Sequence, residues 1–569
     1  MINPTTRTQC AAFFRRSVPD VVNVLVITAV SLSFTFGLEE VLDIGLRDES
    51  AYLWRGVRSE VYEFPPASKA PLYSTWYYVL SFLQPDRVEL YYLNYKILNL
   101  LPSLLFYGFL RAGQANSLVA LAAACLIVTC QGNLQTWPKV SHFALSILFA
   151  GLALASLFKK PSVIFGTVSL AALATSYVRP EYFVAFLLST FACFTIALRA
   201  KRRRDYITPS AVVTTAVLVL IIHGFPMGGE GGRRFVAFQQ HFSLNWVNWT
   251  SSELNPWSDS GQIIRDCFGD AHSATQCALR NPALVLKHIL ANTKSLPSSA
   301  ADLFLCPSQR YGGNLWYSKL PNFYFLALLA FAMLTIGRFS FSRVRSVWRS
   351  TMHMTGATVI LLTSPLVASL LIYPRDHHLL LLTAPALGLC LVLARDCCVK
   401  FQYAPVFCSL TVGAFFLFLM PVVFQATPVL FQASDELPVK TTVVFLKSLE
   451  PDQDVQLLDA EGGFHHYLDD KWHRIKVGAK NEPFHAFRER THINAILLTD
   501  RLAKDSRFRS DSEWQQFISS PEAYDFTSIA IPGTKFRLLH KRYLFRMPGE
   551  VEFRKRASPA TDQSTPSAD

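Results

Sequence analysis

The sequence predicts a polytopic α-helical membrane protein that ends in a small α/β domain. Hydrophobic residues make up 51% of the 569 residues and charged residues only 17%, which is a membrane-like composition and argues against a disordered chain or a wholly soluble enzyme. Apolar runs of about 20 residues, the length that crosses a bilayer as a helix, recur along the chain. The net charge is +13, but the basic residues lie in short runs between apolar stretches, as in membrane proteins, and predict no nucleic-acid partner.

The apolar runs predict eleven transmembrane helices. The predicted spans are approximately residues 20–38, 91–110, 116–131, 140–157, 161–178, 182–198, 208–225, 321–337, 353–373, 379–395 and 404–424. Every second connection between them carries the basic residues, including the run Lys201–Arg204. The positive-inside rule then places the amino terminus in the cytoplasm and the carboxyl terminus outside the inner (plasma) membrane, in the periplasm or extracellular space.

This topology divides the chain into a membrane domain, residues 1–424, and an extracytoplasmic domain, residues 425–556. The membrane domain has a first outer loop at 39–90 and a long outer loop at 226–320. Within the first loop, Pro71–Leu83 is half apolar and rich in Tyr and Trp, which is typical of an interfacial helix. Cys267 and Cys277 would be able to form a disulfide if the long loop lies outside.

The carboxyl-terminal region has shorter apolar runs than the membrane domain. Strands are expected at Val455–Leu458, Ala495–Thr499, Ile529–Ile531 and Phe536–Leu539, and helices around Thr441–Leu449 and Glu513–Ile518. Alternating strands and helices predict an α/β domain. The last residues, 557–569, are rich in Ser, Pro, Thr and Ala and predict a disordered tail.

Two adjacent carboxylates, Asp48 and Glu49, follow the first span closely. A carboxylate that a rigid span holds at the membrane surface can serve as the general base for an incoming hydroxyl group. The alternative is that both carboxylates cap a helix or face water.

Three basic residues, Lys69, Arg179 and Arg375, are predicted at the same face of the membrane. Arginine in short outer turns runs against the positive-inside bias, and phosphate binding at headgroup depth would account for it. The alternatives are contact with lipid headgroups, or pairing within the turns, such as Arg179 with Glu181. His378 can hydrogen-bond a phosphate, but no third ligand accompanies the His377-His378 pair, so no metal site is predicted.

Four short motifs in this order resemble those of the GT-C superfamily of membrane glycosyltransferases, which use polyprenyl-phosphate sugars. The nearest likenesses are to protein O-mannosyltransferases and to the aminoarabinose transferases that modify lipid A. The motifs are Asp48-Glu49, Lys69-Ala70-Pro71-Leu72, Arg179-Pro180-Glu181 and Tyr373-Pro374-Arg375. The second departs from the Lys-Pro-Pro-Leu pattern of the family at Ala70. The resemblance in layout covers nearly the whole chain.

The resemblance implies an inverting glycosyltransferase that moves a sugar from a polyprenyl-phosphate donor to an acceptor hydroxyl group. It implies that Asp48 is the catalytic base, with Glu49 beside it, and that Lys69, Arg179 and Arg375 bind the donor phosphate. His378 belongs to no motif of the family and is expected to bind the same phosphate by its own hydrogen-bonding chemistry. Glu181 and Tyr373 are expected to support them. The acceptor would be a lipid, a glycan or a protein. No cofactor is indicated, and the sequence neither requires nor excludes a divalent metal.

The rival function from another class is a transporter or lipid flippase. Such a protein is expected to carry ionisable residues in the middle of its spans and often inverted repeats. The sequence has few mid-span charges and no matching halves, so the transferase is the preferred hypothesis.

Overall fold

The structure is a computed structural model that describes residues 4–59, 65–134, 137–226, 233–305, 341–398, 437–476 and 482–546. The described chain forms two compact units. The first contains the described residues of 4–38, 55–84 and 92–398, and the second contains those of 39–54, 85–91 and 437–546. The predicted boundary at residue 424 and the predicted tail at 557–569 lie outside the described residues.

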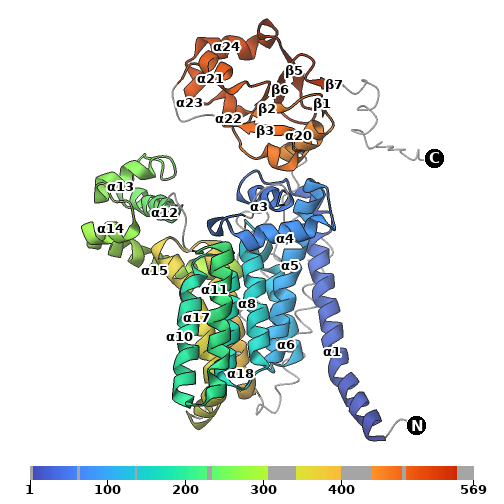
Figure 1. Ribbon diagram of the computed structural model, residues 1–569, viewed down its shortest axis with the longest axis vertical. Helices are drawn as coiled ribbons and strands as arrows, with labels where there is room; N and C mark the ends of the chain where they lie inside the picture. The colour runs from blue at the N-terminus through green and yellow to red at the C-terminus, as the bar shows by residue number, and fades with distance from the viewer. Residues whose placement is uncertain are drawn as a thin grey trace, which may run out of the picture. The chain divides into compact units, whose positions relative to one another are not determined.

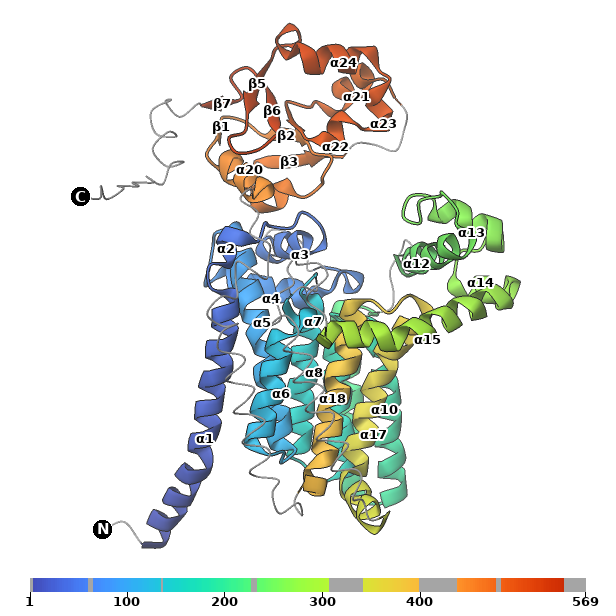
Figure 2. The ribbon, with the colours of Figure 1, turned by 180° about the vertical axis from the view of Figure 1, so that it is seen from behind.

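The first unit is helical throughout its described part (Figures 1 and 2). Three of the helices named below belong to both units: α2 begins in the first unit and ends in the second, whereas α3 and α5 begin in the second and end in the first. The helices up to the long loop are α1 (Pro4–Thr35), α2 (Leu38–Val41), α3 (Asp48–Val57), η1 (Ala67–Lys69), α4 (Pro71–Ser81), α5 (Arg87–Ala112), α6 (Ser117–Thr129), α7 (Gln131–Leu134), α8 (Val140–Ser156), α9 (Pro161–Ser176), α10 (Tyr182–Ala200), η2 (Arg203–Asp205) and α11 (Ile207–His223). They are followed by α12 (Arg233–Thr250), α13 (Ser260–Phe268), α14 (Ala274–Arg280), α15 (Pro282–Leu305), α17 (Phe341–Leu371) and α18 (Asp376–Cys398).

Five helical segments of the described chain are long and apolar enough to cross a membrane. They are Pro19–Val41, Tyr182–Ala200, Arg203–His223, Thr351–Leu371 and Asp376–Leu393, and each coincides with a predicted span. Three shorter apolar helices, α6, α8 and α9, coincide with three more. The predicted span 91–110 lies in α5, which is not among these apolar helices. Its polar residues Asn94, Lys96 and Asn99 lower its mean hydropathy. The predicted spans 321–337 and 404–424 lie outside the described residues.

Small residues allow the bundle helices to approach closely. A Cβ atom added at Gly151 of α8 would lie 2.3 Å from the Cβ atom of Ala171 in α9. One added at Gly388 of α18 would lie 2.7 Å from the rings of Phe106 and Phe109 in α5. Such contacts are typical of membrane helices, which associate through packing because lipid is as apolar as the side chains.

The predicted long loop is helical where it is described, and it has a small core of its own. Phe238 and Phe242 of α12, Ile263 and Phe268 of α13, and Val285 of α15 are among the residues buried together there. The possible disulfide is not formed, because Cys267 and Cys277 are both free thiols.

The second unit contains the predicted α/β domain. Its larger sheet has the strand order β3-β2-β4-β6-β5, in which β2 is parallel to β3 and β4, and β6 is antiparallel to β4 and β5. Strands β1 and β7 form a separate antiparallel pair. The strands are β1 (Glu450–Pro451), β2 (Val455–Leu458), β3 (Trp472–Ile475), β4 (Ala495–Leu498), β5 (Phe526–Ala530), β6 (Arg537–Lys541) and β7 (Phe545–Arg546). The helices are α20 (Pro438–Lys447), η4 (Phe464–Tyr467), α21 (Phe484–Thr491), α22 (Asp500–Ala503), α23 (Ser506–Arg509), α24 (Ser512–Ser519) and η5 (Pro521–Tyr524).

His540 in β6 makes the stability of this sheet sensitive to acid. The residue is 5% exposed, its Nδ1–H donates to the carbonyl of Lys541 (2.9 Å), and burial lowers its pKa below the ordinary 6.5. A histidine with a lowered folded-state pKa stabilises the fold above about pH 6.5, and this contribution is lost as the pH falls toward the folded-state pKa. We expect His540→Asn, which keeps a donor but does not titrate, to reduce the loss of hydrogen-exchange protection in β6 between pH 7 and pH 5. An unchanged loss in the variant would contradict this assignment.

Candidate functional site

The turn between α9 and α10 holds Arg179 in a defined position. The backbone N–H of Arg179 donates to the carbonyl of Thr175 (2.7 Å), which extends the end of α9. Its guanidinium Nε donates to the hydroxyl of Ser141 in the first turn of α8 (3.1 Å), and Nη2 contacts the same oxygen. The arginine of the predicted Arg-Pro-Glu motif is therefore fixed by a neighbouring helix.

The turn between α17 and α18 meets this arginine-bearing turn. The backbone N–H of His378 donates to the carbonyl of Arg375 (2.9 Å), and its side chain is buried in the first turn of α18. The Nδ1 atom of His378 lies 3.6 Å from Oε1 of Glu181, and neither atom has a hydrogen-bond partner among the described residues. Arg179 and Arg375 are both within electrostatic range of His378. The structure thus brings together four predicted site residues from turns almost 200 positions apart.

The segment that carries Lys69 approaches the Arg179 turn through α4. The backbone N–H of Leu72 donates to the carbonyl of Tyr177 (3.4 Å), and the Tyr73 ring packs against Phe143 of α8 (5.6 Å). Lys69 ends the helix η1 and is half-buried. Ala70 has φ 54°, a backbone conformation that the proline ring forbids. A proline would therefore not fit at position 70.

Two aromatic side chains from the long loop join the Arg375 turn, and one of them, His241, was not predicted to be part of the site. The imidazole of His241 in α12 stacks on the predicted supporting residue Tyr373 (5.6 Å, 16°) and meets Trp257 edge-on (5.5 Å, 87°). The Arg375 guanidinium lies 5.6 Å from the Trp257 ring. Burial and the nearby Arg375 charge lower the pKa of His241 to about 4, so the ring is neutral at pH 7. No sequence signal links His241 to Tyr373, because more than 130 residues separate them.

A buried polar network supports the end of α17 just before this turn. His288 of α15 donates from Nε2 to the carbonyls of Leu371 (3.1 Å) and Ile372 (3.1 Å). The Asn245 side chain of α12 donates to Nδ1 of the same ring (2.9 Å). The long loop is therefore bonded to the backbone that presents Tyr373 and Arg375.

Lys139 is a further basic residue at the start of α8 that sequence analysis missed. It is fully buried, donates to the carbonyl of Asn133, and lies 4.2 Å from the ring of Tyr95. These contacts join the start of α8, next to Ser141, to Asn133 of α7 and Tyr95 of α5. The sequence around Lys139 contains no pattern that predicts its contact with the distant ring of Tyr95.

The carboxylate dyad belongs to the second unit and not to the unit that holds the basic residues. Asp48 is exposed at the first residue of α3, and Glu49 beside it is buried, at 4% exposure. The two predicted carboxylates therefore differ in their access to a substrate. Within the described ranges, no three His, Cys, Asp or Glu residues are grouped so that they could hold a metal ion.

The sequence matches no family model, and no curated protein matches it.

Proposed function

We propose that this membrane protein is an inverting glycosyltransferase. It moves a sugar from a polyprenyl-phosphate donor to an acceptor hydroxyl group at the extracytoplasmic face of the inner (plasma) membrane. The amino terminus is cytoplasmic, and the α/β domain lies outside. The acceptor is a lipid, a glycan or a protein.

The observation that carries this proposal is the cluster at the ends of the bundle helices that is formed by two arginines, Arg179 and Arg375, and the buried histidine His378. Arginine gives charge-assisted, bidentate contacts to phosphate oxygens, and Ser141 holds one of these arginines in place. The segment of Lys69 is bonded to the same turn. A phosphate headgroup attached to a membrane-embedded chain is the ligand whose charge and location fit basic residues at helix ends in a membrane protein.

In the proposed reaction, Asp48 accepts the proton of the acceptor hydroxyl as the oxygen attacks the anomeric carbon. A new glycosidic bond forms on the side opposite the phosphate, and the bond between the anomeric carbon and the phosphate oxygen breaks. The electron pair leaves with the polyprenyl phosphate, whose growing charge Lys69, Arg179 and Arg375 stabilise. Configuration at the anomeric carbon is inverted.

The pair of half-buried Glu181 and buried His378 fits a supporting role at the phosphate. Their facing atoms lie 3.6 Å apart and lack hydrogen-bond partners among the described residues. A buried polar atom without a partner costs free energy, and a phosphate oxygen would supply an acceptor for an imidazole N–H. The stacked rings of Tyr373 and His241 support the neighbouring Arg375 turn.

A chemical assay separates this function from the rival transporter or flippase. The purified protein is reconstituted in vesicles with the pool of polyprenyl-phosphate sugars and the envelope glycans extracted from its host cells. We expect free polyprenyl phosphate to appear, as measured by mass spectrometry, because a transferase breaks the bond between sugar and phosphate. Movement of an intact polyprenyl-phosphate sugar across the bilayer, with no release of polyprenyl phosphate, would contradict the proposal and favour a transporter.

A further inference from the structure

The chain on the amino-terminal side of the carboxylate dyad is bonded to the α/β domain within the second unit. The carboxylate of Asp43 accepts hydrogen bonds from the backbone N–H groups of Val439 (2.9 Å) and Lys440 (2.8 Å), the first turn of α20. A carboxylate at this position satisfies amide groups that have no partner within the helix and favours the positive end of its dipole. The Lys440 ammonium also donates to the carbonyl of Glu39 (2.7 Å). Some 400 residues of sequence separate these partners, so the contact is part of the tertiary fold.

The backbone immediately before the dyad lies against η4 and the loop that precedes it. The hydroxyl of Tyr467 donates to the carbonyl of Gly45 (2.6 Å). A Cβ atom added at Gly463 would lie 2.1 Å from the carbonyl oxygen of Leu46, closer than any side chain tolerates. Glycine is required here by the close approach of two backbones.

The residue that follows the dyad is held by a buried histidine. The hydroxyl of Ser50 donates to the carbonyl of Arg47 (2.8 Å), which leaves its oxygen to accept from the Nδ1–H of His466 (2.8 Å). Ser50 is fully buried and His466 is 8% exposed. The ring of Trp54, one turn further along α3, lies 5.7 Å from the His466 ring. The dyad therefore has a fixed contact on each side.

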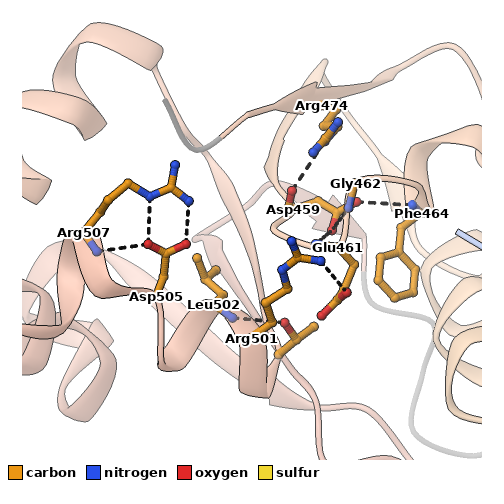
Figure 3. Close-up of polar contacts among 10 residues, drawn as sticks. Asp459, Glu461, Gly462, Phe464, Arg474, Arg501, Leu502, Asp505 and Arg507 are labelled. Carbon is orange, nitrogen blue, oxygen red and sulfur yellow. Dashed lines mark hydrogen bonds and ion pairs between the residues drawn. The ribbon is translucent and has the colours of Figure 1, made fainter. Parts of the chain in front are cut away.

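The loop that makes these contacts is itself fixed by Asp459 at the end of β2 (Figure 3). Its carboxylate accepts hydrogen bonds from the backbone N–H groups of Glu461 (2.8 Å), Gly462 (2.9 Å) and Phe464 (3.2 Å). The guanidinium of Arg474 in β3 approaches the carbonyl of the same aspartate (3.4 Å). The end of β2 thus fixes the loop that contains Gly463 and leads to His466.

From these contacts we infer that the α/β domain positions the Asp48–Glu49 dyad for catalysis, with His466 and Gly463 as positioning residues. The inference rests on the proposed role of Asp48 as the base. A general base works only when it is held in a productive geometry, and a shift of about 1 Å can lower the rate by about 100-fold. The α/β domain therefore contributes to catalysis by the proposed transferase, since it supplies the contacts on both sides of the base.

The first test measures turnover of the full chain with the extracted pool of polyprenyl-phosphate sugars as the probe. We expect His466→Ala to lower kcat by about 100-fold with little change in KM for the donor, because the residues proposed to bind phosphate lie in the other unit. His466→Asn, whose amide N–H can replace Nδ1–H, should recover part of the loss. The matched control is His473→Ala, which removes a half-exposed histidine of β3 and should leave kcat unchanged. If His466→Ala does not accumulate, Ser50→Ala removes the other half of the same bond.

Hydrogen exchange of the full chain tests the same contacts without any substrate. Gly463→Ala and His466→Ala should raise deuterium uptake in residues 43–54 and leave β4 protected. Suppose that Asp48→Asn is inactive but that kcat is native in His466→Ala, Ser50→Ala and Gly463→Ala. This result would overturn the positioning role of the domain and leave the proposed base in place. Native turnover in Asp48→Asn would instead remove the proposed base, whatever the exchange result.

Discussion

Asp48→Asn is expected to lower kcat by about 10²–10⁴-fold, the usual contribution of a general base. The amide cannot accept the proton of the acceptor hydroxyl, but it has the size of the carboxylate and occupies an exposed position at the start of α3. Folding and donor binding should therefore be preserved. Mass spectrometry measures how fast equal amounts of purified wild type and variant consume the polyprenyl-phosphate sugar.

The control for this variant is Asp525→Asn, which neutralises an exposed aspartate of the same unit and should keep native turnover. Glu49→Gln should lower kcat less than Asp48→Asn, because its carboxylate is buried and cannot reach an acceptor as readily. Near-native turnover in Asp48→Asn would exclude this residue as the base.

Arg179→Ala is expected to cost about 2.7–4 kcal/mol of transition-state stabilisation, or roughly 10²–10³-fold in kcat. Charge builds on the phosphate as the sugar leaves, and the guanidinium is aimed by its bonds to Ser141. Arg179→Lys should recover only part of the loss, because an ammonium group cannot reproduce the planar, two-pronged contact. Ser141→Ala should give a smaller loss than Arg179→Ala, because the charge remains while its orientation is loosened.

The control is Arg265→Ala, which removes an exposed arginine from α13 in the long loop. A similar loss of kcat in Arg265→Ala and Arg179→Ala would show that general surface charge, and not a phosphate site, underlies the effect. The rates are measured at a saturating concentration of the donor, so that a lower kcat is distinguished from weaker binding of the donor.

Much of the fold was predictable because it follows from local sequence. Apolar length predicted the helices at Tyr182–Ala200 and Thr351–Leu371, and alternating short apolar runs predicted β2 and β4. Strand β3 was missed because its sequence, Trp472–Ile475, contains a histidine and an arginine and lies at the edge of the sheet. Edge strands need less apolar surface than central ones.

The sequence predicted a residue of the candidate site only where its type is unusual for its position in the chain. Arg179 and Arg375 stood out because arginine is unexpected in short turns between apolar runs. His241 gave no such signal, since only the packing of α12 brings it onto Tyr373. The membership of residues 39–54 in the unit of the α/β domain also depends on contacts between distant parts of the chain, such as that of Asp43 with Val439.

The measurement that tests the central claim most directly compares cells that contain wild-type protein with cells that contain Asp48→Asn at equal membrane abundance. Mass spectrometry follows both the polyprenyl-phosphate sugars and the glycosylated components of the envelope. A transferase predicts that the variant accumulates one polyprenyl-phosphate sugar and that one glycoconjugate lacks the corresponding sugar, which identifies donor and acceptor together. Identical lipid and glycoconjugate profiles in the two strains would contradict the proposed reaction.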